Sequence, residues 1–259
     1  MSAISIISIA LTAFGLMPLV GQPRLSTDAF GALSSDLWLG LRESFVIATT
    51  STILALILGV PAGLALVSVS RIRAALAALT SVILPVPHLI GAASIGLLLS
   101  GGGVLPRWLG VAPSDWPALV AGSFPTAIVI EFAWKESAFI ALIIAAALSS
   151  RLTELSEAAA VLGAGPWQRL RRVTLPMAAP SALAGAIIIY LYTLGSYEVT
   201  WLLGRSYPEA LPVLAYRLFT SIDLTARPQA AAAALLAILS AVAIAGVGIA
   251  ALRRVGVLR

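Results

Sequence analysis

Long apolar runs separated by short polar segments dominate the chain. The clearest run covers residues 230–252, which are 23 consecutive positions without a charged side chain. As a helix this run is about 34 Å long, enough to cross a hydrocarbon core of about 30 Å with some tilt. The pattern predicts an all-α polytopic membrane protein with about six transmembrane helices. The predicted spans cover residues 3–20, 44–69, 74–100, 118–147, 181–203 and 230–252.

Proline and glycine positions predict where these spans bend. The second span contains Gly59, Pro61 and Gly63, which together favour a kink, and the third is interrupted by Pro85 and Pro87. The first run lacks the basic start and the cleavage site of a signal peptide. We therefore expect it to remain as the first span.

The fourth apolar region is the longest and carries charges near its middle. Residues 118–147 would extend about 45 Å as one helix, and they include Glu131, Lys135 and Glu136. Two interpretations remain open. The region forms either one long helix that is kinked at Pro125, or two half-helices.

Arginine placement predicts the orientation of the spans. With six spans and both termini in the cytoplasm, the inner segments hold nine arginines and the outer segments six, and the inner ones lie close to the spans. The inner residues are Arg71, Arg73, Arg151, Arg169, Arg171, Arg172, Arg253, Arg254 and Arg259. The outer residues are Arg24, Arg42, Arg107, Arg205, Arg217 and Arg227.

Composition excludes several classes of function. Hydrophobic residues make up 60% of the 259 positions and charged residues only 10%, and the mean hydropathy is +1.03. The absence of cysteine and the single histidine argue against a disulfide framework and a metal enzyme. The only lysine, Lys135, follows Trp134, so the chain lacks the phosphate-binding loop of an ATPase. The net charge of +5 fits orientation in a membrane better than nucleic-acid binding.

The polar loop after the fourth span has a regular internal design. Residues 154–162 favour a helix, Gly163 suits a left-handed helix end, and Pro166 suits the first turn of a second helix that stops at Leu175-Pro176. Two short helices at the cytoplasmic face would form a rigid projection. The alternative is an amphipathic helix lying on anionic lipid through its arginines.

The spacing of this loop resembles the EAA loop of ABC importer permeases. That pattern has E-A-A, three residues, Gly, nine residues and I-x-L-P, and only Val173 departs from it. The six residues that match are Glu157, Ala158, Ala159, Gly163, Leu175 and Pro176, and the resemblance implies that these and Val173 dock on an ATPase.

The resemblance also implies an organisation and a set of partners. Residues 1–40 match only as a generic first span and external loop, whereas 41–259 resemble the core permease domain. The expected partners are two ABC ATPase subunits, which would bind ATP and magnesium, a second permease that is the same or similar, and an external solute-binding protein. No cofactor is expected in this chain, which would lie in the inner (plasma) membrane.

Ionisable residues inside the spans are candidates for a translocation path. Glu131 and Lys135 lie four positions apart on a helix, so they either pair with each other for packing or line the path together with Glu136. Glu198, beside Tyr197, either binds a cationic or hydroxyl-rich solute or is a protonated or hydrogen-bonded residue near the outer interface. His88 is expected to pack or to form hydrogen bonds rather than to bind a ligand.

The solute and the rival functions remain open at this level. Residues 194–199 and 202–204 resemble the polyamine and ferric-ion branch of these permeases, which together with Glu198 favours a polyamine-like cation. Sugars, ferric ion and other small solutes are alternatives. An ion-coupled secondary transporter and a lipid-modifying membrane enzyme are the rival classes.

Overall fold

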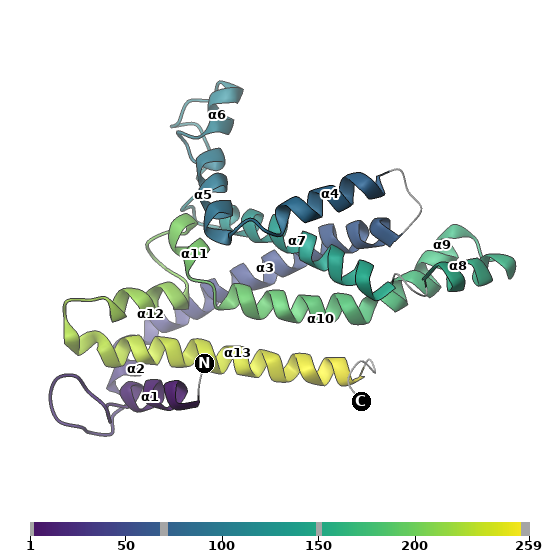
Figure 1. Ribbon diagram of the computed structural model, residues 1–259. Helices are drawn as coiled ribbons and strands as arrows, with labels where there is room; N and C mark the ends of the chain where they lie inside the picture. Colours follow the sequence, from purple (N-terminus) through teal and green to yellow (C-terminus); the bar gives the residue numbers. More distant parts are fainter. Residues whose placement is uncertain (1–2, 68–71, 149–151, 255–259) are drawn as a thin grey trace. The chain divides into compact units, whose positions relative to one another are not determined.

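The computed structural model describes residues 3–67, 72–148 and 152–254, which are helical with no strand in those ranges (Figure 1). The all-α fold predicted from the sequence is confirmed. Arg71, Arg151 and Arg259, used above for orientation, lie outside the described residues. The longer helices are α3 (Ser34–Val67), α5 (His88–Leu99), α7 (Thr126–Leu148), α10 (Leu175–Leu194) and α13 (Arg227–Arg254). The shorter ones are α1 (Ala3–Ala13), α2 (Asp28–Ala32), α4 (Arg73–Ile83), α6 (Val104–Leu109), α8 (Leu152–Val161), α9 (Pro166–Arg169), α11 (Glu198–Leu203) and α12 (Leu211–Phe219).

Within the described ranges, four helical segments are long and apolar enough to cross a membrane. They are Ser34–Val67, His88–Leu109, Pro166–Leu194 and Leu224–Arg254. Helix α7 has 23 residues but carries Glu131, Lys135 and Glu136, so its length rather than its composition qualifies it as a span. The predicted first span is too long: α1 has 11 residues and ends at Ala13, because the chain turns at Gly15 with φ of +72°.

Three other predicted boundaries differ from the structure. The second span begins at Ser34, ten residues before its predicted start at residue 44, and it continues as α-helix through Pro61. The fourth region is one helix beginning at Thr126, directly after Pro125, so it contains neither the predicted kink nor two half-helices. The fifth span ends at Leu194, and α11 begins separately at Glu198. The predicted interruption at Pro85 and Pro87 is confirmed, since α4 ends at Ile83 and α5 begins at His88.

The chain divides into two compact units, each with its own core. Unit 1 combines the residues up to Ala48 with Ala92–Ile128 and Leu191–Ile244, and unit 2 combines Thr49–Gly91, Val129–Tyr190 and the residues from Ala245. The predicted boundary between residues 40 and 41 falls inside α3, and it stays a prediction.

In unit 1, α12 and α13 pack side by side (Figure 1) through Leu211, Leu214, Ala230 and Ala233. Polar bonds hold the loop before α12 against the start of α3. Arg205 donates to Glu43 over 2.7 Å, and the hydroxyl of Ser44 accepts from the backbone N–H of Leu211 over 3.0 Å. Unit 1 is therefore stabilised by apolar packing of α12 on α13 and by these polar bonds between α3 and the region where α12 begins.

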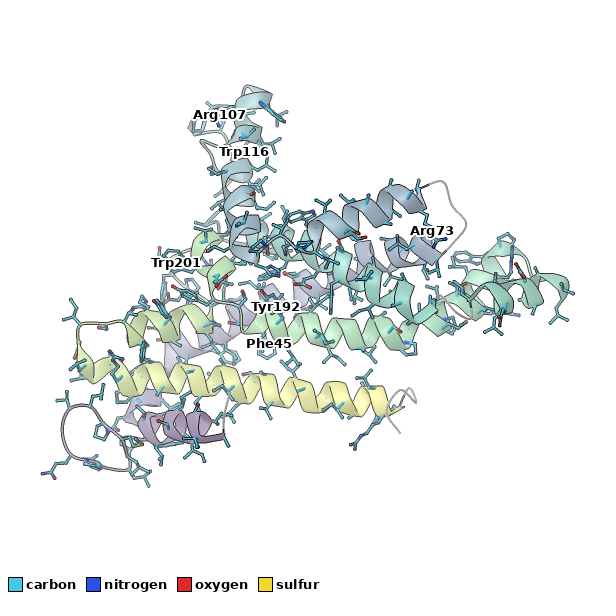
Figure 2. The ribbon with its side chains drawn as sticks, in the orientation of Figure 1. Phe45, Arg73, Arg107, Trp116, Tyr192 and Trp201 are labelled. Carbon is cyan, nitrogen blue, oxygen red and sulfur yellow. The ribbon has the colours of Figure 1, made fainter. Side chains whose placement is uncertain are left out.

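In the α5–α6 segment of unit 1 and the loop after it, side chains form hydrogen bonds to nearby backbone carbonyls. Figure 2 shows Arg107 and Trp116 in this region. Arg107 donates through Nε to the carbonyl of Gly103 over 2.9 Å, and Trp116 donates through Nε1 to the carbonyl of Leu99 over 2.8 Å. The second bond satisfies the carbonyl of the last residue of α5, which has no partner within that helix.

Unit 2 is built on a close contact between α3 and α7. A Cβ added at Gly59 would lie 2.6 Å from Cβ of Ile140, and one added at Gly63 would lie 2.8 Å from the carbonyl oxygen of Ala141. These glycines lie one turn apart, and small residues at this spacing let two membrane helices approach closely. Gly59 and Gly63 therefore serve helix packing, a role that the sequence interpretation did not give them, and the kink stays a prediction.

Candidate functional site

Helix α8 carries the Glu157, Ala158 and Ala159 positions of the sequence motif. Its first turn contains Glu154, an acidic residue where the helix dipole favours negative charge. Glu157 and Ala158 are exposed and Ala159 is half-buried. The helix therefore presents part of the motif on its surface.

Gly163 ends this helix as the sequence predicts. Its φ is +81°, in the left-handed region. The N–H of Ala164 donates to the carbonyl of Ala159 over 3.0 Å, and the N–H of Gly163 donates to that of Ala160 over 2.9 Å. This pair of bonds is the Schellman motif, which uses glycine because a Cβ is strained at positive φ. A Cβ here would meet no heavy atom within 4 Å, so backbone conformation alone selects glycine.

The second short helix continues into the next span without a stop. Helix α9 begins at Pro166, and the side chain of Gln168 accepts from the N–H of Gly165 over 3.3 Å. A π-helical turn, Leu170–Thr174, follows and runs directly into α10. The predicted stop at Leu175-Pro176 is therefore wrong. Pro176 lacks an N–H, and the wider π-turn before it accommodates that loss, as such bulges do at helix irregularities.

We call residues 152–176 the coupling segment. Helices α8 and α9 and the π-helical turn contact one another. At the turn between the two helices Val161 is 88% exposed, Leu162 86% and Trp167 69%. Of the remaining motif residues, Leu175 and Pro176 are exposed and Val173 is half-buried. A compact helical projection with bare apolar side chains at its tip is suited to bind another protein.

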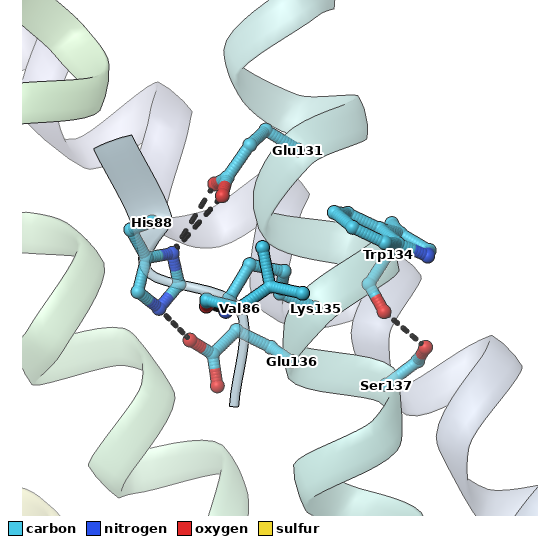
Figure 3. Close-up of polar contacts among 7 residues, drawn as sticks. All are labelled: Val86, His88, Glu131, Trp134, Lys135, Glu136 and Ser137. Atoms are coloured by element: carbon cyan, nitrogen blue, oxygen red, sulfur yellow. Dashed lines mark hydrogen bonds and ion pairs between the residues drawn. The ribbon is translucent and has the colours of Figure 1, made fainter. Parts of the chain in front are cut away.

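A second site in unit 2 is a buried polar cluster of four residues. His88 is the first residue of α5, directly after the proline-rich break, and Glu131, Lys135 and Glu136 lie on α7. Nδ1 of His88 lies 3.1 Å from Oε1 of Glu131, and its Nε2 lies 3.4 Å from Oε1 of Glu136 (Figure 3). Lys135 donates through Nζ to the backbone carbonyl of Val86. The cluster therefore links the start of α5 to the middle of α7.

Burial makes this cluster electrostatically demanding. Glu131 is fully buried, Lys135 is 6% exposed and Glu136 is 8% exposed. His88 can make both contacts as an imidazolium between two carboxylates, or as a neutral imidazole that accepts from one protonated acid and donates to the other. With Lys135 charged, the two acids and two bases sum to zero charge in either arrangement. Charge neutrality is what allows such groups to remain inside a membrane protein.

The structure corrects the predicted Glu131–Lys135 pair. Glu131 bonds to His88, 43 residues earlier, while Lys135 reaches the backbone before α5. Gly91 makes room for this arrangement, since a Cβ there would lie 2.9 Å from Oε1 of Glu131. The expectation that His88 forms hydrogen bonds is confirmed. Its bridging of two acids was missed, although its position beside Pro87 marks it as a helix start.

Tyr197 and Glu198, the remaining path candidates, belong to unit 1. Glu198 is the first residue of α11 and is exposed, with no ion pair to another described residue. The ring of Tyr197 lies 6.2 Å from that of Trp201 and 4.6 Å from that of Tyr216. The structure therefore places a carboxylate beside a cluster of aromatic rings. No group of three or more metal-ligating side chains occurs among the described residues.

Comparison with known sequences identifies relatives over most of the chain. The chain is 31% identical to the inner membrane ABC transporter permease protein YnjC of Escherichia coli K12 over 158 residues, 61% of this chain and 30% of YnjC. It is 30% identical to the trehalose/maltose permease MalF of Thermococcus litoralis over 62% of this chain and 54% of MalF. It is 28% identical to the molybdenum permease ModB of Mycobacterium tuberculosis over 93% of this chain and 91% of ModB. The chain thus spans about half or less of the first two relatives and nearly all of the third.

Solved structures share the fold, and a family match gives the assignment. A bacterial ABC transporter that imports the acidic polysaccharide alginate matches with a TM-score of 0.74 and 21% identity, over 97% of this chain and 90% of that one. The MetNI methionine ABC transporter matches with a TM-score of 0.68 and 19% identity, over 86% of this chain and 98% of that one. Residues 51–255 match the family described as "binding-protein-dependent transport system inner membrane component". The chain belongs to this family of membrane transport components.

Proposed function

We propose that the chain is the permease subunit of an ATP-driven importer and that its coupling segment docks on a separate ATPase. The observation that carries the proposal is the exposed tip of that segment, formed by Val161, Leu162 and Trp167 on either side of the left-handed Gly163. An apolar tip on a rigid turn needs a partner to cover it. Family membership removes the lipid-modifying enzyme from consideration.

The backbone supplies a route by which movement of the coupling segment reaches the membrane. From Pro166 to Leu194 the chain is helical without interruption, passing from α9 through the π-turn to α10. Displacing the tip therefore moves the start of a span directly. Alternating closure and opening of the ATPase would then reorient this span around the translocation path.

The partners belong to the same proposal. Two ATPase subunits bind the ATP and magnesium that this chain does not, and a second permease, the same or similar, completes the path. An external solute-binding protein delivers the solute, as the family description indicates. The alginate transporter named above is known in complex with a pentasaccharide-bound periplasmic protein, which supports this composition by analogy.

The coupling role is tested by changing only the backbone conformation at Gly163. Gly163→Val introduces a β-branched residue at φ of +81°, which strains the Schellman turn. We expect at least tenfold less ATPase to co-purify with this variant from native membranes in mild detergent. Gly163→Asn should retain most of the ATPase, because asparagine tolerates the left-handed region.

Gly110 provides a matched control for this experiment. It also ends a helix at positive φ, +67°, and has no heavy atom within 4 Å of an added Cβ, but it lies outside the coupling segment. Gly110→Val should strain α6 equally and leave the ATPase bound. If Gly163→Val folds and keeps the ATPase, the coupling proposal fails and an ion-coupled transporter becomes the better explanation.

The translocation path and its solute form the finer part of the proposal. Glu131, Lys135 and Glu136 neutralise one another together with His88, which favours a gate or packing element over a binding site. Glu198, exposed beside Tyr197, favours a cation such as a polyamine. The relatives named above are instead a molybdenum permease and a trehalose/maltose permease. The solute-binding protein recovered in the same purification would distinguish these solutes.

A further inference from the structure

Unit 1 contains a large open pocket whose lining includes Tyr197 but not Glu198. Its volume is about 720 Å³, and α1, α12 and α13 line it together with Met17, Leu19 and Tyr197. The lining is mostly apolar, with hydroxyl groups from Ser8, Thr12 and the tyrosines at a few points. This is the size and character of a pocket for an apolar ligand with a small polar end.

Arg227 is the charged residue in this lining. Its guanidinium carbon lies 4.2 Å from the centroid of the Phe219 ring. Its Nε is buried and has no hydrogen-bond partner among the described residues. The ring thus holds a planar cation that no carboxylate neutralises in the described part of the chain. A phosphate group complements such a guanidinium, since it can accept two parallel hydrogen bonds.

The position of Arg227 along α13 gives the depth of the pocket in the membrane. Arg227 is the first residue of this helix, and the apolar span Leu224–Arg254 extends away from it. The start of a span lies near the headgroups, while the next turns lie among acyl chains. Ala230, Ala231 and Ala234 line the pocket on those next turns. A cation at headgroup depth therefore stands at the mouth of an apolar groove.

We propose that this pocket binds an anionic phospholipid, with its phosphate on Arg227 and one acyl chain between α1, α12 and α13. The lipid would fill the groove beside the small alanine faces of α13 and neutralise the stacked guanidinium. This site lies outside the coupling segment and shares only Tyr197 with the path candidates. Its chemistry distinguishes anionic from zwitterionic headgroups, because net charge, rather than the phosphate alone, determines attraction to an uncompensated cation.

The test uses the purified importer, with all co-purifying subunits, and native mass spectrometry with two added lipids. Dioleoyl phosphatidylglycerol should bind about fivefold more tightly than dioleoyl phosphatidylcholine, as expected for one basic residue near an anionic headgroup. Arg227→Gln should abolish this preference. Arg227→Lys should keep part of it, because it retains the charge but not the planar fork.

Two further variants distinguish lipid binding in the pocket from attraction of lipid to surface charge in general. Ala234→Leu fills the groove and should weaken both lipids, whereas Arg24→Gln, which removes an exposed arginine paired only with Asp28, should change neither. Equal binding of the two lipids by the unaltered protein would overturn the proposal. So would an unchanged preference in a folded Arg227→Gln variant, or cross-linking of an Ala234→Cys variant to another subunit that covers the groove.

Discussion

At the scale of single residues, the cluster around His88 shows how buried charges fix a helix start. His88 touches one carboxylate with each ring nitrogen, and the two acids sit five positions apart on α7. The break at Pro85 and Pro87 leaves backbone carbonyls without helical partners, and Lys135 occupies one of them at Val86. His88 and the two acids therefore satisfy one another, so that removing one of the three leaves a buried group without its partner.

Removing His88 should be much more harmful than removing it together with one acid. We expect His88→Leu to lower the stability of the detergent-purified protein by about 3 kcal/mol, because two buried acids lose the polar partner that they share. In the His88→Leu background, Glu131→Gln should restore part of the loss. A double-mutant cycle on thermal unfolding measures the coupling, expected at about 1–3 kcal/mol. Strictly additive effects would show that the two side chains do not interact.

At the scale of secondary-structure elements, close packing holds the helices together. Lipid is as apolar as the helix surfaces, so the hydrophobic effect does not drive them to associate. Gly59 and Gly63 bring α3 against Ile140, Ala141 and Ile144 of α7, so that backbone atoms lie within van der Waals contact. In a bilayer, packing of this kind is a main source of helix association. The two glycines therefore determine how closely the helix carrying the charged cluster is held.

A larger side chain at Gly63 should separate α3 from α7. Its Cβ would lie 2.8 Å from a backbone oxygen, which cannot move aside as a flexible side chain can. We expect Gly63→Leu to cost about 1–3 kcal/mol, read as a lower Tm. Gly246→Leu is the matched control, because that helical glycine has no heavy atom within 4 Å of an added Cβ. Equal Tm values for the two variants would contradict the packing role.

Local features of the elements could be predicted from the sequence, and contacts between elements could not. The left-handed end at Gly163 and the break at Pro85 and Pro87 depend on backbone chemistry within a few residues. The partner of Glu131 depends on a residue 43 positions away, and the role of Gly59 depends on a helix far along the chain. The end of α10 at Leu194 was missed although Gly195 and Ser196, which interrupt the apolar run directly after it, are a sequence signal for a helix end.

At the scale of the whole molecule, α7 carries three charged side chains although it has the length of a membrane span. Its length matches a crossing, and its three charged side chains are all buried within the protein. A charge that is covered by protein and neutralised by a neighbour costs far less than one exposed to lipid. The inward location of these side chains therefore makes α7 a span despite its composition.

This crossing can be tested because the chain has no cysteine of its own. Ser114 precedes α7 and Gln168 follows it, and both are exposed. We expect Ser114→Cys to react with an impermeant maleimide added outside intact spheroplasts, and Gln168→Cys to react only after the membrane is opened. Thr220→Cys, between α12 and α13, should behave like Ser114→Cys. Labelling of Ser114→Cys and Gln168→Cys from the same side would show that α7 does not cross.

In the π-helical turn between α9 and α10, the number of residues matters independently of which residues they are. An α-helix advances about 100° per residue, so a turn that holds one extra residue shifts the angular phase of everything on one side of it relative to the other. The direction in which Trp167 points is thus set, relative to the faces of α10, by the number of residues in Leu170–Thr174. The spacing between Gly163 and Val173 therefore determines the direction, around the axis of α10, in which the coupling segment projects.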